Sequence, residues 1–116
     1  PEELSLMLYT GLIKYILQTQ SAILENDLEK ANNCCIKAQN IIRYFQSTLD
    51  IKYELSTQLS LLYDFMHQRL IDANISKDNG ILTEVLDLAR DLRDTWGQAM
   101  KIAKKNLGNR FQAAGG

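Results

Sequence analysis

The sequence predicts an all-α protein, an antiparallel up-down-up-down four-helix bundle. Apolar residues recur at the spacing of one helix face in four successive segments, and no segment shows the alternation of a β-strand. Short joints separate these segments, and short joints between long helices place neighbouring helices antiparallel. The 116 residues suit one domain. We therefore expect a single bundle over residues 1–107 and a flexible tail over residues 108–116.

The first two helices are expected at residues 1–25 and 26–49. Pro1 suits the start of a helix, because the first backbone N–H groups of a helix have no intrahelical partner. Asn26 is the expected N-cap of the second helix, with Glu29 three residues later as in a capping box. The apolar stripe of the second helix consists of Ala31, Cys34, Cys35, Ala38, Ile41, Ile42, Phe45 and Leu49.

A weakly marked joint at residues 50–53 leads to a third helix that ends near Ile75. The clearest turn is S-K-D-N-G at residues 76–80. The fourth helix is expected at residues 81–107, with Gly108 as its stop. Trp96 lies in the apolar stripe of this helix. We expect it to fill the core, and anchoring of a partner is the alternative.

The first helix carries apolar residues in two opposite rows when it is drawn at about 100° per residue. The first row consists of Leu4, Leu8, Gly11, Leu12, Tyr15 and Ala22. The second row consists of Leu6, Ile13, Leu17 and Leu24, and the two bridging residues are Tyr9 and Ile16. A surface helix of a small protein needs only one apolar stripe. The second row is therefore either buried by tighter packing within the bundle or covered by a partner.

Composition argues against nucleic-acid binding and against membrane insertion. The chain has 13 basic and 14 acidic residues, whereas a nucleic-acid binder normally carries a basic patch. Charged residues interrupt every apolar run before it reaches the roughly 18 residues of a membrane span. We expect neither nucleic acid nor a membrane among the partners of this chain.

The sequence offers no pattern of catalytic or metal-binding residues. His67 is the only histidine, and acid–base chemistry or metal ligation needs a second converging group. Neither a glycine-rich phosphate loop nor a Glu-x-x-His motif is present. Cys34 and Cys35 are adjacent, a spacing that does not suit a disulfide within a helix, so we expect small core residues in a reducing compartment. The chain is predicted to be no enzyme and to hold no cofactor and no metal.

Five sequence blocks follow one another in the order and at the spacing of a known family. Residues 1–11, P-E-E-L-S-L-M-L-Y-T-G, match the pattern P-x-x-L-x-x-M-L-Y-x-G. Residues 37–42, K-A-Q-N-I-I, match K/R-A-Q-x-I-I, and L-D follows at residues 49–50. Residues 62–70, L-Y-D-F-M-H-Q-R-L, are similar to L-Y-D-Y-M-x-R-R-L, and D-A-N-I continues that block at residues 72–75.

The last helix completes the set with E-V-L at residues 84–86 and L-R-D-T-W at residues 92–96. Together these blocks resemble the bacterial flagellar secretion chaperones, the FliS family, over about residues 1–100. The chain departs from the family pattern at His67 and Gln68, where a more basic pair is usual before Arg69.

The resemblance implies a cytoplasmic helical chaperone that binds the C-terminal region of flagellin. Such a chaperone prevents premature polymerisation and delivers its client to the flagellar type III export apparatus. The flagellin segment is disordered when free and forms helices on the chaperone. This function needs apolar grooves between helices and needs no catalytic groups. The sequence agrees with both needs, because it has apolar helix faces and no catalytic pattern.

The predicted flagellin-binding surface comes from the helical wheel, because the resemblance does not settle which row of the first helix faces the client. The surface residues we expect are Leu6, Tyr9, Ile13, Leu17 and Leu24, with Leu61 and Phe65 of the third helix as a second choice. The alternative function is a self-associating structural bundle with no client, in which the second row forms a homodimer seam. A weak homodimer of the chaperone is left open as well.

Overall fold

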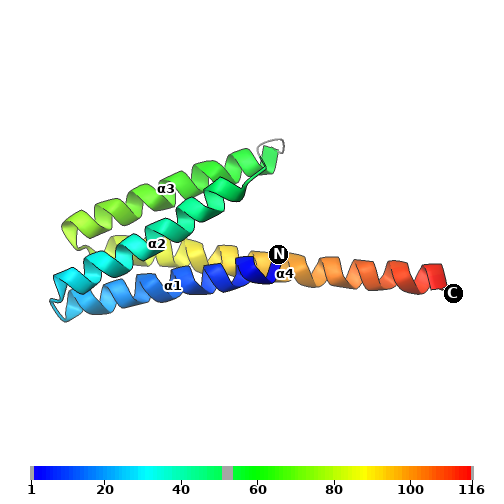
Figure 1. The fold of residues 1–116 in the computed structure, drawn as a ribbon, viewed down its shortest axis with the longest axis horizontal. Helices are drawn as coiled ribbons and strands as arrows, with labels where there is room; N and C mark the ends of the chain where they lie inside the picture. Colours follow the sequence, from blue (N-terminus) through cyan, green and yellow to red (C-terminus); the bar gives the residue numbers. More distant parts are fainter. Residues whose placement is uncertain (1, 51–53, 116) are drawn as a thin grey trace.

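A computed structural model describes residues 2–50 and 54–115, and this part of the chain forms four helices and no strand (Figure 1). The helices are α1 (Glu2–Leu24), α2 (Leu28–Thr48), α3 (Glu54–Ser76) and α4 (Asn79–Gly115). Each helix packs against two neighbours, because α1 and α3 both contact α2 and α4. The predicted all-α four-helix bundle is confirmed.

The turn between α1 and α2 is built from two residues with different tasks. Asn26 has a φ of 58°, in the left-handed region that Asn tolerates better than most residues. Asp27 caps α2, since its carboxylate accepts a hydrogen bond of 3.1 Å from the backbone N–H of Lys30. The expected N-cap was Asn26, which is wrong by one residue: Asn26 makes the turn and Asp27 makes the cap.

The turn between α3 and α4 lies where the sequence predicts it. Lys77 has a φ of 54°, and the carboxylate of Asp78 accepts a hydrogen bond of 2.8 Å from the N–H of Gly80. The turn is shorter than expected, because α3 continues to Ser76 and α4 begins at Asn79. The other predicted joint, at residues 50–53, falls mainly on residues 51–53, which lie outside the described residues.

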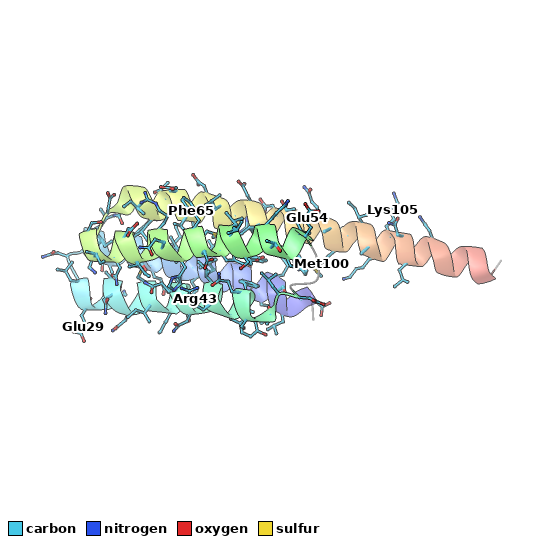
Figure 2. The ribbon with its side chains drawn as sticks, turned by 90° about the horizontal axis from the view of Figure 1, so that it is seen from above. Glu29, Arg43, Glu54, Phe65, Met100 and Lys105 are labelled. Atoms are coloured by element: carbon cyan, nitrogen blue, oxygen red, sulfur yellow. The ribbon has the colours of Figure 1, made fainter. Side chains whose placement is uncertain are left out.

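α4 is longer than the sequence predicts. It was expected to end at Leu107, but it continues through Gly108 to Gly115. A single glycine costs only about 1 kcal/mol in a helix, and no proline follows to stop it. All side chains of residues 101–109 are exposed, and Figures 1 and 2 show this part of α4, which carries Lys105, extending past the other helices. The flexible tail at residues 108–116 stays a prediction.

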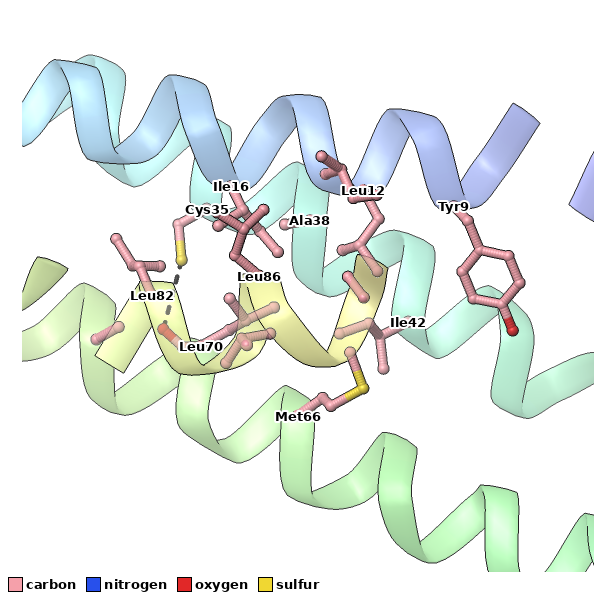
Figure 3. Packing of buried hydrophobic residues seen from close by; sticks show 14 of the residues in the cluster. Tyr9, Leu12, Ile16, Cys35, Ala38, Ile42, Met66, Leu70, Leu82 and Leu86 are labelled. Carbon is pink, nitrogen blue, oxygen red and sulfur yellow. Dashed lines mark hydrogen bonds between the residues drawn. The ribbon is translucent and has the colours of Figure 1, made fainter. Parts of the chain in front are cut away.

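The core runs along the axis of the bundle and receives side chains from all four helices (Figure 3). The fully buried residues include Leu12, Ile16, Cys35, Ile42, Met66, Leu70, Leu82 and Val85. The Cys35 thiol donates a hydrogen bond of 3.4 Å to the carbonyl oxygen of Leu70 across the α2–α3 contact. Cys34 and Cys35 are both free and buried, so their predicted role as small core residues is confirmed.

The structure corrects the description of α1 as a helix with two opposite apolar faces. Its buried side is centred on the bridging residues Tyr9 and Ile16. On one flank, a Cβ added to Gly11 would make an ordinary van der Waals contact of 3.6 Å with Cδ1 of Ile41, so this flank faces α2. On the other flank, the amide of Gln20 donates to α4. The two rows are thus the flanks of one wide arc between two neighbouring helices.

Candidate functional site

An apolar groove opens at the end of the bundle where α2 ends and α3 begins. Its volume is about 650 Å³. In Figure 1 the α2–α3 pair diverges from the α1–α4 pair toward this end. We call it the end groove, and its lining residues are Leu4, Ser5, Tyr9, Tyr44, Phe45, Thr48, Leu49, Leu55, Leu59, Tyr63, Leu92, Thr95, Trp96 and Ala99.

The end groove exists because the buried core stops before the ends of the helices. Tyr9 is the first buried residue of α1, and Tyr63 is the first of α3. Beyond them, Leu4 and Leu55 are exposed, although both lie at spacings that continue the core faces of their helices. Trp96 is 36% exposed on the wall of the groove, so it does not fill the closed core as expected.

Three aromatic rings form the floor of the end groove. Phe45 stacks on Tyr9 with a centroid distance of 4.4 Å and on Tyr63 with one of 5.7 Å. The hydroxyl oxygens of Tyr9 and Tyr63 lie 2.6 Å apart and share a buried hydrogen bond. Burial raises the pKa of both phenols, so this pair stays neutral at ordinary pH.

The walls of the end groove are uncharged. Of the described residues that line it, none carries a charge, and the polar ones are hydroxyl-bearing: Ser5, Thr48, Thr95 and the tyrosines. A groove of this kind attracts apolar side chains, because water held against its walls is released when they bind. None of its described lining residues could hold or activate a charged substrate.

The structure does not bring the predicted site residues together. Tyr9 lines the floor of the end groove, and Leu6 borders a separate, shallower hollow of about 400 Å³ on α1. Ile13 was expected on an open face, but it is only 6% exposed, since the contact with α4 covers its flank of α1. Tyr9 is likewise nearly buried, because it forms part of the aromatic floor.

Four other predicted residues are exposed but lie outside the end groove. They are Leu17, Leu24, Leu61 and Phe65. The residues that sequence reasoning missed come from all four helices and meet only in the folded bundle. A usable signal was present in Trp96, whose alternative role as a partner anchor matches its place on the groove wall.

Metal or acid–base chemistry finds no support in the described part of the chain. No three His, Cys, Asp or Glu side chains come together there in a way that could hold a metal ion. His67 lies at the boundary of the bundle, with its Nδ1 atom 3.2 Å from Nη2 of Arg43. Within the same described residues, no helix has an apolar stretch long enough to cross a membrane.

Comparison with known proteins identifies the family. The model of the family described as "Flagellar protein FliS" matches residues 1–103. The chain belongs to the FliS family. A FliS relative from Bacillus subtilis is 44% identical over 106 residues, which cover 91% of this chain and 80% of the relative. One from Salmonella typhimurium is 31% identical over 84% of this chain and 75% of its own length.

A third FliS relative, from Vibrio cholerae, is 27% identical over 84% of this chain and 74% of its own length. All three are named flagellar secretion chaperones. The FliS family expected from the five sequence blocks is therefore confirmed. Membership in a family of chaperones also confirms the prediction that the chain is not an enzyme.

Proposed function

We propose that this flagellar secretion chaperone binds the C-terminal region of flagellin in the end groove. Binding there keeps flagellin from polymerising early in the cytoplasm and allows delivery to the flagellar type III export apparatus. The observation that carries the proposal is the groove itself: an uncharged, apolar channel that four helices line and that no described residue fills. An amphipathic helix that folds on binding suits such a channel.

The groove alone is too small for tight binding of a flexible segment. A stable interface needs at least about 1,000 Å² of buried surface. The client must therefore extend beyond the groove onto other parts of the bundle. Two further contact surfaces are proposed, one on α1 with the exposed Leu17 and Leu24 and the half-buried Leu6, and one on α3 with the exposed Leu61 and Phe65.

The proposal is tested by placing a charge in the end groove. Leu55 is 64% exposed and lies in the first turn of α3, where an acidic residue favours the helix. We expect Leu55→Asp to fold normally and to weaken binding of a flagellin C-terminal peptide at least about tenfold, because the carboxylate would lose water against apolar walls. Isothermal titration calorimetry measures this loss.

Leu28→Asp is the matched control. Leu28 is 50% exposed, opens α2 and lies outside the end groove. We expect it to change peptide affinity by no more than about twofold, as surface substitutions usually do. Unchanged affinity in a folded Leu55→Asp variant would remove the end groove as the flagellin site.

Self-association is checked on the same proteins by analytical ultracentrifugation. A stable dimer of the unmodified chain that Leu55→Asp dissociates would favour the structural bundle over the chaperone, because the groove would then be covered by a second copy. A monomer at concentrations that saturate the peptide supports the chaperone.

A further inference from the structure

The floor of the end groove carries a polar feature, the hydroxyl pair of Tyr9 and Tyr63. The two oxygens lie 2.6 Å apart, and the exposed fractions of the two residues are 5% and 3%. Both residues line the end groove. Figure 3 shows the Tyr9 hydroxyl directed away from α1, at the end of the core cluster opposite Leu82.

The hydrogen bond between the two phenols leaves one proton unused. Each hydroxyl has one hydrogen to donate, and a bond between them consumes only one of the two. Among the described residues, neither hydroxyl has a second hydrogen-bond partner. A buried donor without an acceptor is costly, so this proton is satisfied by water or by whatever occupies the groove.

The described lining of the end groove favours an uncharged acceptor. No described residue that lines the end groove is cationic, so a carboxylate bound there would lose its water without gaining a counter-charge. A backbone carbonyl oxygen meets the requirement. Carbonyl groups inside a helix are already bonded, whereas those of the last turn of a helix or of a non-helical stretch are free.

We propose that the Tyr9–Tyr63 hydroxyl pair determines the register of the bound flagellin segment by donating a hydrogen bond to a free backbone carbonyl of that segment. This inference rests on the proposed binding of flagellin in the end groove. It adds a buried polar contact to the hydroxyls of Ser5, Tyr44, Thr48 and Thr95 on the groove walls, and it requires that the segment ends or breaks a helix above the aromatic floor. Apolar contacts alone would allow the segment to slide, because they are not directional.

The test uses Tyr→Phe variants, which remove the oxygens and keep the rings that stack on Phe45. We expect the double variant Y9F/Y63F to bind a flagellin C-terminal peptide about tenfold more weakly in calorimetry. The variant removes the donor hydroxyls and leaves the carbonyl acceptor of the peptide buried without a partner. Each single variant keeps one hydroxyl whose proton is free, so each should lose less than about threefold. Such non-additivity is not expected from a loss of packing.

Y15F is the matched control, since it also removes one tyrosine hydroxyl, and the half-buried Tyr15 does not line the end groove. It should alter affinity by less than about twofold. As a second readout, peptide binding should slow the exchange of a tyrosine hydroxyl proton in NMR spectra of the unmodified chain and of Y15F, but not of Y9F/Y63F.

The outcomes separate this inference from the proposed function. The proposed function itself fails if the unmodified chain does not bind the peptide. It also fails if the folded Leu55→Asp variant binds the peptide as tightly as the unmodified chain does. If the unmodified chain binds and Y9F/Y63F binds equally well or more tightly while remaining folded, only the role of the hydroxyl pair is overturned. A single variant as weak as the double variant would also overturn it.

Discussion

His67 shows how a single residue on the α2–α3 surface responds to its neighbours. Its Nδ1 atom accepts a hydrogen bond from Arg43, whose guanidinium also lies 3.4 Å from the carboxylate of Asp64. Partial burial lowers the pKa of His67, the positive charge of Arg43 lowers it further, and Asp64 opposes both effects. The folded bundle therefore prefers the neutral imidazole.

A pH dependence of stability follows from this preference. As pH falls through about 6.5, the ordinary pKa of histidine, the unfolded chain takes up a proton before the folded chain does. We expect the free energy of unfolding to fall over this window and the loss to level off below the lowered pKa of the folded state. Urea unfolding of the unmodified chain and of His67→Gln between pH 7.5 and 5 measures the difference. A difference that does not change with pH would contradict the assignment.

At the scale of the helix, the sequence predicted the existence of each element better than its orientation. The apolar spacing located all four helices, because it reports which residues share a face. It could not report how far that face extends around α1, since this depends on where α2 and α4 lie. Ile13 became buried for this reason, while Leu17, four residues later, remained 42% exposed.

The C-terminal end of α4 shows a second feature that the sequence did not predict. Gly108 is typical of a helix stop, but a glycine stops a helix only where the chain turns into a left-handed conformation. No positive φ occurs at a described glycine of this chain, and α4 continues past Gly108. The end groove was beyond prediction as well, because its lining residues are brought together only by the packing of four helices.

The corrected orientation of α1 leads to a paired prediction. Ile13→Asp places a carboxylate in the core without a partner, and we expect a loss of several kcal/mol, enough to unfold the bundle at room temperature. Leu17 lies on the exposed side of α1, so Leu17→Asp should change the free energy of unfolding by about 0.5 kcal/mol or less. Far-UV circular dichroism and urea unfolding distinguish the two. A folded Ile13→Asp variant would show that the second row of α1 is open after all.

The whole molecule is 63 Å long, and the bundle within it divides into three parts along that axis. The end with the two short turns is closed, the middle is a continuous core, and the other end opens into the groove. α4 alone continues past the groove. Ala99 still lines the groove, whereas every side chain of residues 101–109 is exposed.

This division predicts that the projecting part of α4 is dispensable for folding and for the groove. The side chains of residues 104–109 are exposed and do not pack against another helix. This part of α4 is helical only because it continues the helix formed by the packed part. We expect a chain that ends at Ala103 to keep its free energy of unfolding within about 0.5 kcal/mol. It retains Trp96, Ala99 and Met100, so its affinity for a flagellin C-terminal peptide should also stay within about twofold. Urea unfolding and calorimetry measure the two quantities. A large loss of affinity at unchanged stability would contradict this prediction. It would indicate that flagellin also contacts the exposed side of α4 that carries Ile102 and Leu107, since the truncated chain lacks Leu107.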